Sequence, residues 1–169
     1  MIRRGDLLSC DFGIYYLGLC TDMQLSAYVC RMGEDDAPQG IKDALKKAAR
    51  VAEILINEFR EGMTGNEIAT LAVKKAEAEG LRPLIYTHAL GYHGHAAGSQ
   101  INSRNIDSRS LGEYPLHLNT VYAIEFSNSS NVPEWDNQNV SINYEDDAVY
   151  TAQGCKFIIG HQTELFLIK

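Results

Sequence analysis

Apolar and polar positions follow several different periods along this chain, and each period predicts one kind of element. Residues 6–13 alternate and then turn apolar, and residues 25–31 show a similar pattern. Alternation of this kind is typical of half-buried strands. We therefore expect a β-hairpin or a short meander at the start of the chain.

The next pattern is helical. Pro38 stands at a position that favours a helix start, and apolar residues then recur at steps of three and four as far as Gly62. These residues are Ile41, Leu45, Ala48, Ala52, Leu55 and Phe59. A second helix is predicted after Thr64, because Thr64 and Glu67 have the spacing of a capping box, and Gly80 marks its end.

Strand-like runs fill the part of the chain that follows. They cover residues 121–126, 140–144, 148–151, 155–159 and 165–168, with turn residues between them. Residues 99–114 are polar and are expected to form a loop. The order of strands, helices and strands predicts an α+β domain.

Composition narrows the class of protein. With 169 residues, of which 45% are hydrophobic, residues 1–169 are expected to form a single domain. The net charge of −7 disfavours a nucleic-acid or membrane-surface partner, since both require clustered basic residues. No run reaches the ~18 apolar residues of a membrane span. The four cysteines lack any Cys-x-x-Cys pairing, so we expect free thiols in a cytoplasmic protein.

Acidic residues and histidines recur in an order that suits metal binding. Asp11 and Asp22 come first, a histidine-rich stretch covers residues 87–98, and Glu125 and Glu145 lie within strand-like runs. Carboxylates and imidazole are ligands for divalent cations such as Mn²⁺, Fe²⁺ and Co²⁺. Two such ions about 3.5 Å apart share a water, lower its pKa and polarise a carbonyl, which is the chemistry of metal-assisted amide hydrolysis.

A single carboxylate of this kind is more often structural. Asp11 suits a turn beside Gly13, and Asp22 suits a hydrogen bond to Thr21. Glu125 favours the metal-binding interpretation over the structural one, because a carboxylate among the apolar residues 121–126 is costly to bury without a cation or another partner.

Four blocks, taken in order, resemble the pita-bread metallopeptidases, the family of methionine aminopeptidase, Xaa-Pro aminopeptidase and prolidase. The blocks are residues 5–13, Asp22, residues 121–125 and residues 144–151. The resemblance spans essentially the whole chain, and it is greatest to the Xaa-Pro aminopeptidase-like branch, because two aspartates follow Glu145. It implies a curved antiparallel sheet with a metal site on its concave face and helices on its convex face.

The resemblance also implies a ligand set. Two divalent ions (Mn²⁺, Co²⁺, Fe²⁺ or Zn²⁺) would be held by Asp11, Asp22, His93, Glu125 and Glu145. Relatives usually have Gly-His-Gly at the histidine block, whereas residues 91–95 of this chain read Gly-Tyr-His-Gly-His. His93 is the expected ligand because its His-Gly pair is retained, and His95 is the alternative.

The implied activity is hydrolysis of the N-terminal peptide bond of short peptides, with a preference for proline in second place. Glu125 or Glu145 would relay the proton of the attacking water, and His88 resembles the family histidine that binds the tetrahedral oxygen.

Complete relatives have further helices and strands before the block at residues 5–13, so we expect an abbreviated scaffold. The alternative function is therefore a pita-bread-like module that binds a peptide or protein without hydrolysing it. A homodimer would cover the exposed sheet edge.

Overall fold

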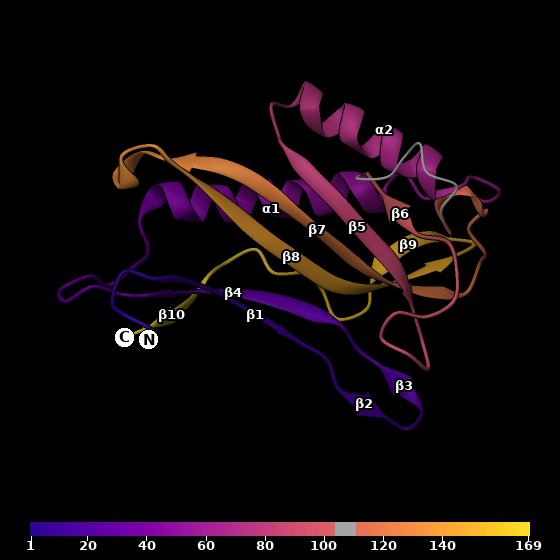
Figure 1. Ribbon diagram of the computed structural model, residues 1–169, viewed down its shortest axis with the longest axis horizontal. Coiled ribbons are helices and arrows are strands. Elements are labelled where there is room, and N and C mark those ends of the chain that lie inside the picture. The colour runs from indigo at the N-terminus through magenta and orange to yellow at the C-terminus, as the bar shows by residue number, and fades with distance from the viewer. Residues whose placement is uncertain (104–110) are drawn as a thin grey trace.

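The computed structural model describes residues 1–103 and 111–169, and it combines one large sheet with two helices (Figure 1). The helices are α1 (Gln39–Ile56) and α2 (Gly65–Ala78), and short 3-10 helices lie at Leu111–Glu113 and Pro133–Trp135. The large sheet contains β1 (Leu7–Phe12), β4 (Met23–Val29), β5 (Pro83–Leu90), β6 (Ile101–Asn102), β7 (Thr120–Val132), β8 (Gln138–Thr151), β9 (Gly154–Phe157) and β10 (Phe166–Ile168). A separate hairpin contains β2 (Tyr15–Tyr16) and β3 (Leu19–Cys20). These elements confirm the α+β class.

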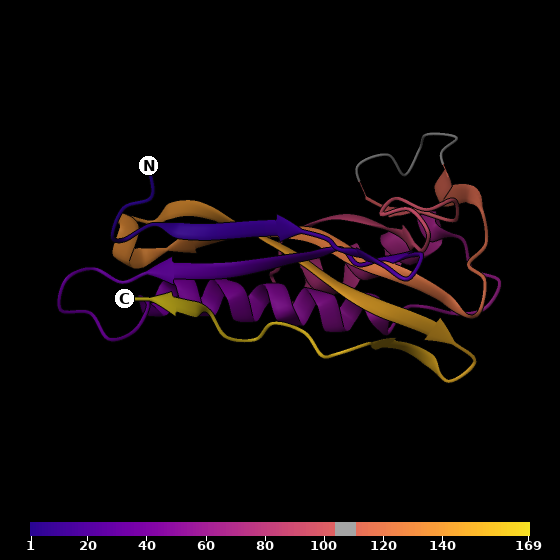
Figure 2. The same cartoon turned by 90° about the horizontal axis from the view of Figure 1, so that it is seen from below.

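The strands of the large sheet follow the order β1-β4-β8-β7-β5-β6, with β9 beside β8 and β10 beside β4. Neighbouring strands are antiparallel, except that β10 runs parallel to β4. Helix α1 packs along β7 and β8 on one face of the sheet, which Figure 2 shows from the side. The buried Tyr122, Ile124 and Phe126 of β7 belong to the hydrophobic core that includes this helix. Because side chains alternate along a strand, Ala123 and Glu125 point to the opposite face.

The two helices confirm the predicted pattern, with one correction. Helix α1 ends at Ile56, so Phe59 lies beyond it and does not continue its stripe as predicted. Phe59 is nevertheless buried, and its ring packs edge-on against Tyr122 and Tyr150. The chain therefore turns early while the aromatic side chain still reaches the core.

Helix α2 begins with the predicted capping box. The backbone N–H of Glu67 donates to Thr64 Oγ1 at 3.2 Å, and the backbone N–H of Thr64 donates to Glu67 Oε2 at 2.8 Å. Two N–H groups that would otherwise lack partners at the helix start are thereby satisfied.

Several strands are longer than predicted. Strand β8 runs without a break from Gln138 to Thr151, where two strands were expected. Strand β5 includes His88, which the sequence placed in the histidine-rich stretch at residues 87–98. Within the predicted loop at residues 99–114 the structure has the short strand β6 and a 3-10 helix, and residues 104–110 of that loop lie outside the described residues.

Strands β4 and β8 are joined, among the described residues, by the single pair Gln24–Glu145. Two residues after Gln24, Gln162 connects β4 to β8. Its Oε1 accepts a hydrogen bond from the backbone N–H of Ser26 on β4, and its Nε2 donates to the carbonyl oxygen of Ser26, each at 2.8 Å. Its backbone carbonyl accepts a hydrogen bond from Tyr144 on β8 at 2.9 Å. The two halves of the sheet therefore meet at Gln24 and Glu145.

Within the described residues, no helix is long and apolar enough to cross a membrane. All four cysteines lie in the described part of the chain and are free thiols, as expected.

Candidate metal centre

One row of paired residues crosses the sheet and carries three of the predicted ligands. Asp11 of β1 is paired with Gln24 of β4, Gln24 with Glu145 of β8, and Glu145 with Glu125 of β7. Directly paired residues present their side chains on the same face of a sheet. Segments far apart in the sequence thus bring three carboxyl groups together on the face opposite α1.

Asp22 reaches the same place from the residue just before β4. Its backbone N–H donates to Asp147 Oδ1 at 3.2 Å, which joins the start of β4 to β8. Oxygen atoms of Asp11, Asp22 and Glu145 lie within 4.8 Å of one another. All four predicted carboxylates therefore belong to one cluster.

His88 supplies an imidazole to this cluster. It is paired with Ala123 of β7, two residues from Glu125, so it shares the face of that carboxylate. Its Nε2 atom lies 3.6 Å from Glu125 Oε2, 3.6 Å from Glu145 Oε1 and 3.9 Å from Asp22 Oδ2. Its other ring nitrogen, Nδ1, lies 3.1 Å from the carbonyl oxygen of Ala89. A backbone carbonyl accepts only, so Nδ1 carries the hydrogen and the neutral ring leaves a lone pair on Nε2.

The predicted ligand His93 is placed differently. Its ring is exposed and packs edge-on against Tyr92, and it belongs to none of the groups of potential ligands found among the described residues. His95 is closer, since its ring stacks on His88 at 4.0 Å and it forms a group with His88 and Asp22. The structure thus brings His88 and His95 to the carboxylates, whereas the ligand role of His93 stays a prediction.

Like charges and burial shift the proton affinities of the cluster. Burial and the charge of Glu145 raise the pKa of Glu125 to about 7 and that of Asp22 to about 6. Burial alone would lower the pKa of His88, but the nearby carboxylate of Glu145, the carbonyl of Ala89 and the charge of Glu125 raise it. Asp22, Glu125 and His88 therefore keep their protons to a higher pH than ordinary groups of their kind do.

Gln24 is a member of the site that the sequence did not single out. It is buried, and its Nε2 atom donates to Glu145 Oε2 at 2.9 Å and lies 3.4 Å from Glu125 Oε1. Its position two residues after Asp22 in a strand was the available signal, since alternation places it on the same side as Asp22.

The donor set fits divalent cations. His88 Nε2 is buried and, within the described part of the chain, has no hydrogen-bond partner, although three carboxylates face it. A buried polar atom without a partner and a group of mutually repelling carboxyls are both costly. Cations bound by oxygen and imidazole would remove both costs.

A family model for metallopeptidase family M24 matches residues 1–152, which is most of the chain. The chain belongs to metallopeptidase family M24. This M24 chain is 24% identical over 169 residues to the uncharacterized peptidase YqhT of Bacillus subtilis (strain 168). That match covers 99% of this chain and 43% of the curated protein, so the chain spans less than half of its relative's length.

Solved structures share the fold of this M24 chain. The X-Pro aminopeptidase of Thermotoga maritima matches with a TM-score of 0.73 and 22% identity, over 99% of this chain and 43% of the enzyme. The N-terminal domain of the FACT complex subunit SPT16 from Cicer arietinum matches with a TM-score of 0.70 and 13% identity, over 100% of this chain and 39% of that chain. These likenesses confirm the expected fold, over less than half of each relative.

Proposed function

We propose that this chain carries the metal site of an exopeptidase that hydrolyses the N-terminal peptide bond of short peptides. The observation that carries the proposal is the buried, unpartnered His88 Nε2 facing Asp22, Glu125 and Glu145. Membership of family M24 supports the reaction class. The fold shared with an X-Pro aminopeptidase supports substrates with proline in second place.

We propose Asp11, Asp22, Glu125, Glu145 and one imidazole as ligands for two divalent ions. His88 suits the imidazole position better than His93, because its free ring nitrogen faces the carboxylates. When bound, the ions would supply a water of lowered pKa and a polarised scissile carbonyl.

The protein's own groups have separate roles in this proposal. Glu125 would accept the proton that the water loses, since its carboxyl group lies within the cluster that would hold the ions. Gln24 would orient Glu145 through its amide. His88 cannot bind metal through Nε2 and also donate from Nε2 to a tetrahedral oxygen, so its ligand role excludes the oxyanion role predicted for it.

Peptide hydrolysis tests the proposal directly. Ala-Pro and Ala-Pro-Ala are incubated with the protein and added Mn²⁺ or Co²⁺, and release of alanine is measured. Wild type is expected to release alanine, and Glu125→Gln to lose at least about 100-fold in kcat/KM. Glu77→Gln, at an exposed position on α2, is the matched control. If neither peptide is hydrolysed with Mn²⁺ or with Co²⁺, the enzyme proposal is wrong.

The alternative of a binding module has one observation in its favour, the shared fold of a domain from a complex subunit, SPT16. It predicts peptide binding by calorimetry without release of alanine. The two functions are therefore separated by the same pair of peptides.

We also propose that a second copy covers the open end of the sheet. Strand β1 stands at the end of the strand order, and the side chain of Phe12 on this strand is exposed. Phe166 and Ile168 expose further apolar side chains on β10, on the other side of β4. Light scattering is expected to show a dimer. A stable monomer at micromolar concentration would overturn this part.

A further inference from the structure

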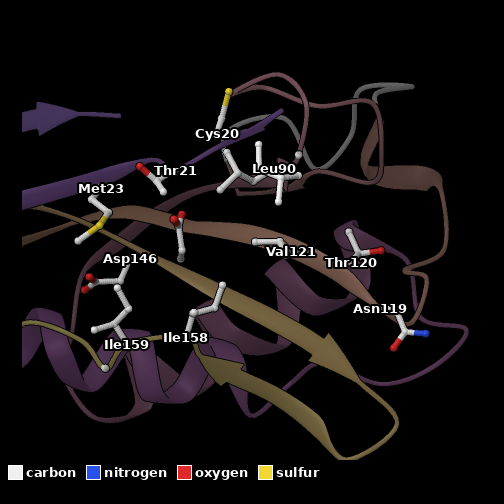
Figure 3. Close-up of a pocket in the computed structure, with 14 residues that line it drawn as sticks. Cys20, Thr21, Met23, Leu90, Asn119, Thr120, Val121, Asp146, Ile158 and Ile159 are labelled. Atoms are coloured by element: carbon white, nitrogen blue, oxygen red, sulfur yellow. The ribbon is translucent and has the colours of Figure 1, made fainter. Parts of the chain in front are cut away.

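The segment between β9 and β10 crosses from one half of the sheet to the other. It begins after β9, which pairs with β8, and it ends in β10, which pairs with β4. Near its start, Ile158 and Ile159 share the wall of a cavity with Asp146 of β8 (Figure 3). The backbone N–H of Ile158 donates to the carbonyl oxygen of Asp147 at 3.0 Å. The segment is therefore hydrogen-bonded to β8 before it reaches β4.

Gln162, in the middle of this segment, is hydrogen-bonded to both halves of the sheet. Its backbone N–H donates to Asp146 Oδ2 at 3.2 Å, and its carbonyl oxygen accepts from the hydroxyl of Tyr144 at 2.9 Å, so its main chain is held on β8. Its side-chain amide exchanges two hydrogen bonds of 2.8 Å with the backbone N–H and carbonyl of Ser26 on β4. Paired residues of antiparallel strands exchange the same two bonds, so the amide takes the place of a strand residue.

The partners of Gln162 lie next to the proposed metal site. Ser26 is two residues after Gln24, and Tyr144 and Asp146 are the chain neighbours of a proposed ligand, Glu145. All three partners are buried, where water competes little for their hydrogen bonds. Because β4 and β8 share only one residue pair among the described residues, these bonds strengthen the junction at the ligands.

The groups of potential ligands are divided unequally between the two halves of the sheet. His88, Glu125 and Glu145 form one group, and all three belong to β5, β7 and β8. Each of the other groups found among the described residues includes Asp22, which precedes β4, and one of them also includes Asp11 of β1. An ion in the first group depends on one half alone, whereas an ion bound by Asp11 and Asp22 depends on the spacing of the two halves.

We propose that Gln162 is a positioning residue for the ion that spans both halves. Its amide holds β4 against β8 and thereby sets the distance from Asp11 and Asp22 to Glu145. The inference rests on the proposed two-ion site. Ligand atoms must lie within about 0.2 Å of their ideal distances from a metal ion, so a small shift between the halves is enough to weaken binding. Loss of the amide therefore weakens the ion that spans both halves and leaves the other ion unchanged.

Calorimetric titration with Mn²⁺ tests this role without requiring turnover. We expect wild type to bind two ions, and Gln162→Ala to bind one with unchanged affinity and the other at least about tenfold more weakly. The variant keeps the main-chain bonds to Asp146 and Tyr144, so the segment stays on β8. Gln153→Ala removes an exposed amide from the turn after β8 and should bind both ions like wild type. Equal weakening of both ions, or of neither, would contradict the proposal.

Hydrogen exchange in the metal-free protein separates the positioning role from the proposed chemistry. The backbone N–H of Asp22 donates to Asp147 Oδ1 across the two halves, so its exchange rate reports how firmly they are joined. We expect this amide to exchange at least about fivefold faster in Gln162→Ala, while amides in the middle of β7 exchange as in wild type. Acceleration of β7 to the same extent would show a general loss of stability and would refute a positioning role.

Gln162→Glu is a second variant, of the same size as wild type. Its carboxylate still accepts from the N–H of Ser26, but it cannot donate to the carbonyl oxygen of that residue. We therefore expect the same selective loss of one ion and faster exchange at Asp22, also if Gln162→Ala does not fold. Wild-type behaviour of Gln162→Glu in both measurements would overturn the proposal. If both results are as expected but no peptide is hydrolysed, only the proposed reaction is wrong.

Discussion

Gln24 Nε2 donates a hydrogen bond of 2.9 Å to Glu145 Oε2, at the single residue pair that joins β4 to β8 among the described residues. A neutral amide thereby fixes one oxygen of a buried carboxylate, and it leaves the other oxygen, Oε1, facing His88. The same contact links the two halves of the sheet and orients a proposed ligand.

Replacing Gln24 by Ala should therefore weaken metal binding. Loss of an outer hydrogen bond to a ligand typically costs 10–100-fold in metal affinity, and we expect a loss of about that size for Mn²⁺. Isothermal titration calorimetry measures it. Gln39→Ala removes an exposed amide that bonds Asp43 on α1 and should have no effect. Equal Mn²⁺ affinity in Gln24→Ala and wild type would show that the amide does not orient Glu145.

Three single substitutions separate the candidate ligands. Asp22→Ala and His88→Ala each remove a group of the cluster, and we expect each to lower Mn²⁺ affinity at least about 100-fold, because a direct ligand is lost. His93→Ala should bind Mn²⁺ like wild type, since its ring is exposed and lies outside the ligand groups. The opposite result for the two histidines would restore the ligand that the sequence favoured.

The metal-free protein should lose stability as the pH rises from about 5 to about 7.5. The folded-state pKa values of Glu125, about 7, and Asp22, about 6, lie above the ~4.3 and ~3.9 of unfolded chains. The folded state therefore binds more protons than the unfolded state in this window, and the free energy of unfolding falls with increasing pH.

Thermal unfolding in the presence of EDTA checks this sign. We expect a lower Tm at pH 7.5 than at pH 5, and a smaller difference in Glu125→Gln, whose side chain does not ionise. Mn²⁺ should raise the Tm at pH 7.5, because a ligand that binds only the folded state stabilises it. A Tm that rises with pH in the wild type would refute the proton-binding argument.

The capping box at α2 should contribute measurably to stability. Thr64→Ala removes the hydroxyl that accepts from the backbone of Glu67, and we expect the free energy of unfolding to fall by about 1 kcal/mol. Thr70→Ala is the control, since its hydroxyl bonds a carbonyl within the same helix and its loss should cost little. Urea denaturation of both variants distinguishes an effect of the cap from a general effect of losing threonine.

Local patterns were sufficient for the two helices and the capping box, whereas the four carboxylates were singled out by four dispersed blocks that resemble a metallopeptidase family. Periodicity and capping depend on residues within a few positions of each other, so they can be read directly along the chain. Glu125 could be singled out for a related reason, because a carboxylate inside an apolar strand requires a partner.

The position of His88 beside the carboxylates was visible only in the tertiary structure. The retained His-Gly pair favoured His93, but the pairing of His88 with Ala123 turns His88 toward Glu125 and Glu145. The role of Gln24 also depends on a distant partner, Glu145, which lies 121 positions away. Strand β8 is continuous because it pairs with β7 along almost its whole length. Register between distant strands is set by the packing of the whole sheet, so no local pattern contains it.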